Sequence, residues 1–220
     1  MIVKKYTDWE KVLLDTSAIV CLLRSLIDDK VPTCNFIKKL LEDLSTKKSS
    51  GKKNRTFYIS AISIAEILSK TTSETKAEKI VKAIQSDNVI FYSFDTEIAE
   101  FIVKNYHAHL GREKLNDFAR QLSWPEHDLS IARQWIEKDL MLIATAHFLG
   151  CDTIITIDKN TMLPLAEKVD YYCCIAEEAN FQLSTNGNSI FNYNKPSIPK
   201  PKKASKRKTT SSSTVPPLPS

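Results

Sequence analysis

The stretch Thr153-Ile154-Ile155-Thr156-Ile157-Asp158 decides the fold. It is β-branched and mostly apolar, and it ends in an acid. A strand with one face in water alternates apolar and polar residues, whereas a strand covered on both faces is continuously apolar. Three further runs of this kind lie upstream, at residues 12–14, 57–59 and 89–92. Together they predict a mostly parallel sheet that is buried between layers of helices.

Amphipathic stretches between these runs predict the covering helices. Apolar residues recur there at helical spacing, and we expect helices over residues 18–26, 34–44, 63–70, 74–85, 97–105 and 140–149. The last of them stops before Gly150, a usual residue just past a helix C-terminus. This alternation of strands and helices predicts the α/β class, as a three-layer sandwich with a mostly parallel central sheet flanked by helices.

The chain divides into a mildly acidic body and a basic end. Its 220 residues carry a net charge of +5, but seven basic and no acidic residues lie in 195–220, which leaves −2 for the remainder. That segment is also rich in Pro and Ser, and it holds too little apolar surface to offset its chain entropy. We therefore expect a folded domain over 1–183 with a helical insertion near 104–137, a linker over 184–194 and a disordered basic tail over 195–220.

Several classes of protein are excluded by composition. The four glycines are too scattered for a dinucleotide-binding motif or a P-loop. No apolar run approaches the ~20 residues of a membrane-spanning helix, and the first residues do not resemble a signal peptide. The five cysteines show no CxxC spacing, which is typical of reduced thiols. We therefore expect a cytoplasmic protein with no membrane partner.

Four acids fall where this fold would bind a ligand. Ligands of open α/β sheets bind outside the carboxyl ends of the strands. Asp15 directly follows the first strand and Asp158 the fourth, while Glu66 and Asp139 are expected in the first turns of two helices beside them. Each acid also has a structural explanation: Glu66 would complete a capping box with Ser63, Asp139 would face a helix dipole, and the other two would cap the segments after them.

Carboxylates gathered at one edge of a sheet need positive charge. Two like charges about 4 Å apart repel by about 4 kcal/mol at an effective dielectric constant near 20. That is a large share of the roughly 5–15 kcal/mol that stabilises a domain. Such groups must protonate, spread apart or bind cations, and oxygen ligands favour Mg²⁺ or Mn²⁺. An ion of this kind can hold a phosphate and orient water for phosphodiester hydrolysis.

The stretches that contain these acids resemble the motifs of the PIN-domain ribonucleases. Leu14-Asp15-Thr16-Ser17 resembles the first motif of that family. Residues 59–67, which contain Glu66, resemble the second motif. Residues 139–146, which begin with Asp139, resemble the third, and residues 156–160, which contain Asp158, resemble the fourth. All four occur in the order of the family and span most of the expected folded body.

The resemblance implies a PIN-like nuclease domain over 1–183. It implies a metal-dependent endoribonuclease that hydrolyses phosphodiester bonds of single-stranded RNA, as in the VapC-like toxins of toxin–antitoxin pairs. It further implies that Asp15 and Asp139 hold Mg²⁺ or Mn²⁺, that Glu66 and Asp158 complete the catalytic set, and that water is the nucleophile. The supporting polar groups that it implies are Ser17, Thr156 and Asn160.

Basic and aromatic residues are candidates for RNA contact. The polar loop before the second strand carries five positive charges, among them Lys52, Lys53 and Arg55, which could bind phosphates; a solvated loop is the alternative. Four aromatic residues are candidates to stack on bases: Tyr58, Tyr92, Trp124 and Trp135. For Tyr58 and Tyr92, a place in the core of a strand is the favoured alternative. The partners expected are an RNA substrate, an antitoxin protein and a second copy of the chain in a homodimer.

Two other functions compete for the same residues. A non-catalytic RNA-binding or regulatory protein could use a PIN-like scaffold and bind RNA through its basic loop and tail. A phosphatase with an aspartyl nucleophile of the haloacid-dehalogenase type would need an acid two positions after Asp15, where this chain has Ser17. The presence of all four acids favours the nuclease.

Overall fold

A five-stranded parallel sheet forms the centre of the protein. The structure, a computed structural model, describes residues 5–25, 31–45, 55–71, 73–107, 111–121, 129–183 and 191–193. The strand order is β3-β2-β1-β4-β5, and every neighbouring pair in the sheet is parallel. The predicted α/β class with a parallel sheet is confirmed. The strands are β1 (Lys11–Leu14), β2 (Thr56–Ser60), β3 (Val89–Tyr92), β4 (Thr153–Thr156) and β5 (Cys173–Ile175).

The first strand of the chain lies in the middle of this sheet. Leu14 of β1 is in register with Ile59 of β2 on one side and with Ile155 of β4 on the other. The chain builds β2 and β3 outward in one direction and β4 and β5 in the other. The strand order therefore reverses between β1 and β4, and it is at such a switch point that open α/β sheets bind their ligands.

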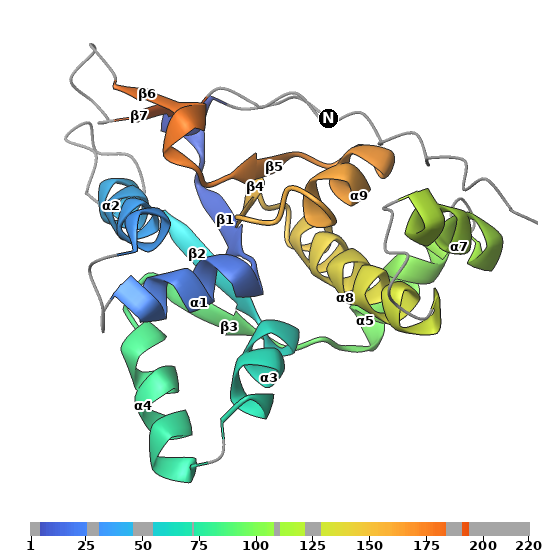
Figure 1. Cartoon of the computed structure of the whole chain (residues 1–220), viewed down its shortest axis with the longest axis horizontal. Helices are drawn as coiled ribbons and strands as arrows, with labels where there is room; N and C mark the ends of the chain where they lie inside the picture. The colour runs from blue at the N-terminus through green and yellow to red at the C-terminus, as the bar shows by residue number, and fades with distance from the viewer. Residues whose placement is uncertain are drawn as a thin grey trace, which may run out of the picture.

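Helices cover both faces of the sheet, which gives the predicted three layers (Figure 1). Val12 and Leu14 pack into a buried cluster with α1 and α2, whereas Leu13, between them, packs toward α5, α8 and α9. This explains why β1 reads as continuously apolar. The helices are α1 (Thr16–Ser25), α2 (Pro32–Ser45), α3 (Ala61–Ser69), α4 (Glu74–Ile84), α5 (Thr96–Ile102), α7 (Arg112–Gln121), α8 (Leu129–Phe148) and α9 (Met162–Lys168).

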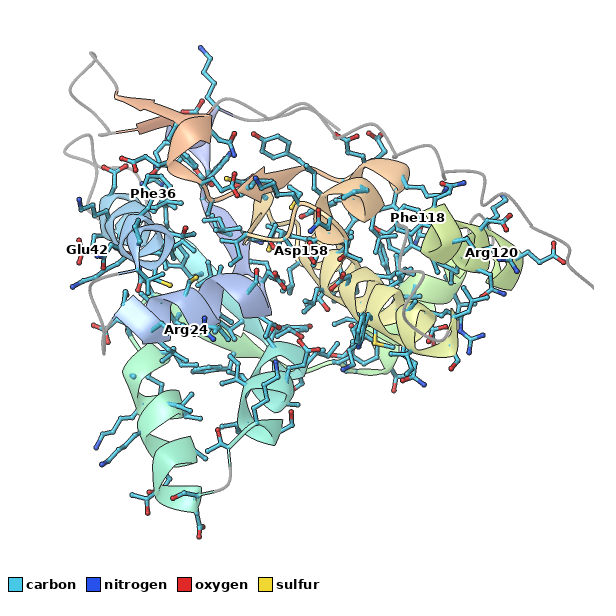
Figure 2. The ribbon with its side chains drawn as sticks, viewed as in Figure 1. Arg24, Phe36, Glu42, Phe118, Arg120 and Asp158 are labelled. Carbon is cyan, nitrogen blue, oxygen red and sulfur yellow. The ribbon has the colours of Figure 1, made fainter. Side chains whose placement is uncertain are left out.

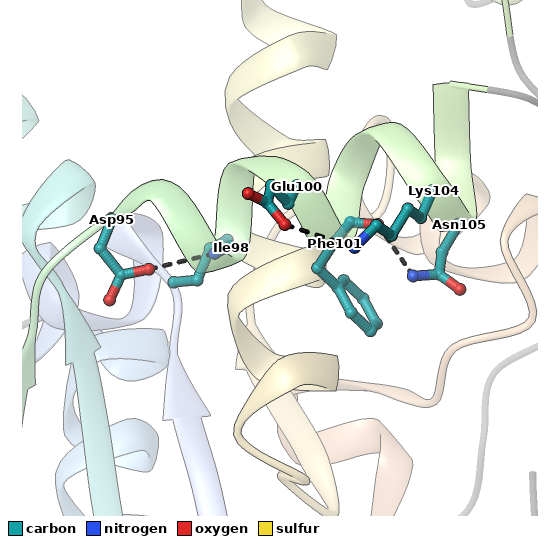
Figure 3. A network of polar contacts seen from close by, with 6 residues as sticks. All are labelled: Asp95, Ile98, Glu100, Phe101, Lys104 and Asn105. Carbon is teal, nitrogen blue, oxygen red and sulfur yellow. Dashed lines mark hydrogen bonds and ion pairs between the residues drawn. The ribbon is translucent and has the colours of Figure 1, made fainter.

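The segment after β3 begins a capped helix and then changes its winding. The Asp95 carboxylate accepts a hydrogen bond from the backbone N–H of Ile98 at 3.0 Å, which fixes the start of α5. The α-helix continues as a π-helical turn, η2 (Val103–His107), in which the Asn105 amide donates to the Phe101 carbonyl at 2.9 Å. Figure 3 shows both contacts. We predicted one uninterrupted helix here.

The segment of the expected helical insertion near 104–137 is helical where the structure describes it, and its last helix continues past residue 137. Helix α8 runs without a break from Leu129 to Phe148, whereas we predicted a helix that starts at residue 140. Helix α7 packs against it, and Leu115 and Phe118 belong to the same buried cluster as the second half of α8. The segment is therefore part of the layer that covers the sheet.

Three short strands lie near the end of the described part of the chain. Strand β5 is the fifth strand of the sheet and was missing from our prediction. Strands β6 (Phe181–Leu183) and β7 (Phe191–Tyr193) form an antiparallel pair, so the expected linker over 184–194 contains a strand. The tail over 195–220 lies outside the described residues. Across the described ranges, no helix combines the length and the apolar character needed to cross a membrane.

Candidate active site

Asp15 lies between the carboxyl ends of β1 and β4 and is held there by hydroxyl groups. Its side chain is buried, and its Oδ2 accepts hydrogen bonds from Ser17 Oγ at 2.5 Å and from Thr156 Oγ1 at 2.6 Å. The two hydroxyl oxygens are themselves 3.1 Å apart. Two of the three predicted supporting residues therefore contact Asp15 directly, although they are far apart in the sequence.

The surroundings of Asp15 act on its pKa in opposite directions. Burial raises the pKa, because the charged form loses its hydration, and the nearby charge of Asp158 adds to this effect. The hydrogen bonds from Ser17 and Thr156 lower it, because they favour the ionised form. Burial is the larger influence, so the pKa of Asp15 is raised. The hydroxyls thus partly compensate a carboxylate that the fold has placed away from water.

Asp158 follows β4 in the connection to α9, where Figure 2 labels it. Its Oδ1 accepts backbone hydrogen bonds from Asn160 at 2.8 Å and from Thr161 at 2.9 Å. The capping role that we considered for Asp158 therefore exists, and it uses one carboxylate oxygen. Asn160, the third predicted supporting residue, contributes its backbone N–H here, and its side chain is exposed.

Glu66 faces the site from α3. The helix begins earlier than predicted, after Ser60, whose hydroxyl accepts from the Ile62 N–H at 3.2 Å. Glu66 therefore lies past the first turn, and the capping box considered for it is wrong. Its Oε2 accepts from Thr16 Oγ1 at 2.7 Å, and its Oε1 pairs with Lys138 Nζ at 3.2 Å. These contacts orient the carboxylate toward α1 and α8.

Asp139 lies in the interior of α8, so the helix-dipole explanation considered for it is wrong as well. Its side chain is half-buried. Its pKa is raised to about 8, first by burial and then by the charges of Asp15, Asp158 and Glu66, while Lys138 lowers it. Repulsion of this kind requires that the other three carboxylates lie nearby. The structure therefore gathers the four predicted acids around one position.

A polar hollow of about 210 Å³ opens at this position. Asp15 does not line it and lies directly after the last residue of β1. The hollow thus brings together residues from α3, from α8 and from the segment after β4. The lining residues are Glu66, Trp135, Lys138, Asp139, Asp158 and Thr161.

Three residues of this site were not predicted from the sequence, namely Thr16, Lys138 and Thr161. Lys138 places a positive charge among the acids, and Thr16 donates a hydrogen bond to Glu66. Lys138 and Glu66 are separated by 72 positions, so no local spacing could have linked them. The one signal for Lys138 in the sequence was its position next to Asp139. This signal is weak, because lysines are common on exposed helix faces.

The donor atoms suit a hard divalent cation, because all of them are oxygens. Within the described ranges, no three Asp, Glu, His or Cys side chains are arranged as a ready group of ligands. Glu66 is bound to Thr16 and Lys138, and Asp15 Oδ2 is bound to hydroxyls. Mg²⁺ usually takes one or two carboxylates and retains several waters. The chemistry of these oxygen atoms therefore suits a hydrated divalent ion, although the described residues do not form a closed cage.

Of the three residues predicted to contact RNA, the structure describes only Arg55. Lys52 and Lys53 lie outside the described residues. Arg55 is only 7% exposed, and its guanidinium donates to the carbonyls of Trp9 at 2.9 Å and Leu44 at 3.0 Å. The prediction for Arg55 is wrong, because its guanidinium is buried and donates its hydrogen bonds to backbone carbonyls.

Arg55→Ala should lower the free energy of unfolding by about 1–3 kcal/mol, because it leaves buried carbonyls without donors. Urea unfolding measures this loss. As a control, Lys104→Ala removes an exposed cation that pairs with Glu100 and should change stability by less than about 0.5 kcal/mol. Unchanged stability of Arg55→Ala together with weaker RNA binding would restore the original prediction.

Comparison with known proteins adds no family assignment: no family model matches the chain, and no curated protein matches its sequence. The classification therefore comes from the fold. The chain is an α/β protein whose five-stranded parallel sheet, in the order 3-2-1-4-5 with flanking helices, has PIN-like topology.

Proposed function

We propose that this protein is a divalent-metal-dependent endoribonuclease that hydrolyses phosphodiester bonds of single-stranded RNA. The observation that carries the proposal is the meeting of Glu66, Asp139 and Asp158 at one polar hollow. The pKa of Asp139, which burial and the neighbouring carboxylates raise to about 8, agrees with it. A fold gains no stability from acids that repel one another, and such groupings are typical of functional sites. Their place at the switch point of the sheet supports the same conclusion.

The side chains divide the work of hydrolysis among them. Asp15 and Asp139 would hold Mg²⁺ or Mn²⁺, which when bound neutralises phosphate charge and favours ionisation of water. The hydroxyls of Ser17 and Thr156 fix Asp15 Oδ2 in place. Asp158, one of whose oxygens is fixed by backbone N–H groups, would accept a hydrogen bond from the attacking water with the other.

Glu66 and Lys138 would contribute through their charges, Glu66 toward a proton and Lys138 toward a phosphate. Glu66 would assist Asp158 as a second acceptor for the proton of the attacking water. Lys138 Nζ, which is 3.2 Å from Glu66 Oε1, offers a positive point charge to a phosphate that enters the hollow. The reaction adds water across one P–O bond and yields a phosphate monoester and a hydroxyl. No protein side chain becomes covalently attached.

A second candidate function is a non-catalytic RNA-binding or regulatory protein on the same scaffold. The observation that favours it is that two of the acids are engaged by other groups of the protein, Glu66 in an ion pair with Lys138 and Asp158 in capping hydrogen bonds. An antitoxin partner, which the resemblance to toxin nucleases implies, stays a prediction. A homodimer also stays a prediction.

Cleavage of end-labelled single-stranded RNA distinguishes the two functions. We expect cleavage with Mn²⁺ or Mg²⁺, none in EDTA, and a loss of about 10²- to 10³-fold in Asp158→Asn. Asp117→Asn is the matched control, because that acid is exposed on α7 and pairs with Arg120, and it should cleave like the wild type. Cleavage that persists both in EDTA and in Asp158→Asn would overturn the nuclease proposal. RNA binding without turnover at saturating Mn²⁺ would favour the regulatory protein.

A further inference from the structure

We infer that Trp135 is a base-stacking platform that selects an unpaired nucleotide beside the carboxylates. The inference rests on the proposed function, because it names how that site recognises a single strand. It begins from the position of the residue on α8. Trp135, Lys138 and Asp139 are spaced three and four residues apart, so they lie on one face of the helix, and all three line the polar hollow.

The exposure of Trp135 is not explained by the core. Its side chain is 39% exposed, whereas Trp9 is fully buried in an aromatic cluster. Ile131, one turn earlier on α8, is 42% exposed and extends the apolar surface away from the acids. The neighbouring face of the same helix, about 100° around its axis, buries Ala132 and Ile136. Helix α8 therefore directs one apolar face into the core. A second apolar face, which contains Trp135, is exposed at the polar hollow.

The spacing along α8 fits a nucleotide. Four residues of an α-helix rise about 6 Å, which separates Trp135 from Asp139 along the axis. Stacked bases are about 3.4 Å apart, so a base that lies on Trp135 would be one or two nucleotides from a phosphate at the acids. Lys138 is positioned between the two and can meet the connecting backbone as a point charge.

An indole can stack only on a base whose face is open. In a duplex both faces of each internal base are covered by its neighbours, whereas bases of a single strand can be splayed onto aromatic side chains. Stacking of this kind tolerates any base, so Trp135 would select unpaired RNA without reading its sequence. The ligand class that the site recognises is therefore a single strand with at least one unstacked base.

Binding measured in EDTA tests this inference without turnover. The probes are a labelled ten-nucleotide oligoadenylate and a strand of the same length made of abasic spacers, which have equal phosphate charge. We expect Trp135→Leu to weaken oligoadenylate binding by about 5- to 150-fold and to leave the abasic strand unaffected. Trp135→Phe, which retains a ring, should stay within about threefold of the wild type.

Two further measurements separate stacking from a structural role. The salt dependence of oligoadenylate binding should be the same in Trp135→Leu and the wild type, because no phosphate contact is lost. Tryptophan fluorescence should be quenched by oligoadenylate in the wild type and less so in Trp135→Phe. Phe91→Leu is the matched control, since Phe91 is 38% exposed on the edge strand β3, and it should bind like the wild type.

Equal weakening of both strands by Trp135→Leu would indicate a structural effect and overturn the inference. So would unchanged binding of oligoadenylate, or equal affinity for an RNA duplex of the same sequence. These outcomes are independent of the nuclease proposal. If metal-dependent cleavage is present but the stacking difference is absent, only the role of Trp135 fails. If the stacking difference is present without cleavage, the nuclease proposal fails and the site binds single strands without cutting them.

Discussion

Asp139→Asn should reduce RNA cleavage by about 10³-fold and at the same time make the protein more stable at pH 8. The loss follows because a carboxylate that would hold the metal is removed, and the ion supplies several kcal/mol of charge stabilisation in the transition state. The gain follows because the pKa of Asp139 is raised to about 8 by burial and by Asp15, Asp158 and Glu66. A neutral amide of the same shape removes that repulsion.

The opposite signs of these two effects make the test specific. Thermal unfolding followed by circular dichroism gives the stability, and the RNA assay gives the activity. Glu100→Gln removes an acid whose side chain is 63% exposed on α5 and should change neither quantity appreciably. An Asp139→Asn protein that is destabilised, or that still cleaves RNA at the wild-type rate, would contradict the assignment.

The stability of the wild type relative to Asp139→Asn should fall as the pH rises from about 4 to about 8. The pKa of Asp139 is about 8 in the folded protein, against an ordinary value of 3.8. Between these values the folded state binds more protons than the unfolded state, so raising the pH destabilises the fold, by an amount on the order of a few kcal/mol. Urea unfolding at several pH values measures this difference.

The comparison with Asp139→Asn removes the influence of groups that do not interact with Asp139. Burial lowers the pKa of His147, which makes the folded state bind fewer protons and acts in the opposite direction as the pH rises. That influence is present in both proteins and cancels. A difference that stays constant from pH 4 to pH 8 would show that Asp139 is not under the repulsion described.

Mn²⁺ should restore the stability that is lost at high pH. A cation that binds only the folded state at 100 times its Kd stabilises by about 2.7 kcal/mol. The gain should shrink at pH 5, because protons compete for the same carboxylates, and it should be much smaller in Asp139→Asn. Absence of any shift with millimolar Mn²⁺ at pH 8 would argue against a metal at these acids.

Much of the fold could be read from the sequence because buried strands leave a local signal. Four runs of apolar, β-branched residues became β1 to β4 of the sheet. Strand β5 was not predicted because it is three residues long and its Cys173-Cys174 pair suggests no strand on its own. The early start of α8 was not predicted because residues 129–138 are an even mixture of polar and apolar residues, and whether such a segment is helical depends on what packs against it.

The site was predictable only in part, for a physical reason. The four acids follow strands or occupy helices whose places the topology fixes, so their convergence could be expected. Their partners could not: the ion pair of Lys138 with Glu66 joins two helices that are distant in the sequence. The burial of Arg55 was hidden for the same reason, since the carbonyls that it binds belong to other segments.

The central position of β1 also bears on how the chain acquires its fold during synthesis. One side of β1 can pair as soon as β2 emerges, but the other must wait for β4, since Leu14 pairs with Ile155. Until then an apolar strand with open backbone groups is exposed, which is the condition under which nascent chains aggregate. Ribosome-bound fragments that end before residue 153 should therefore depend on chaperones, and fragments that extend beyond β5 should not.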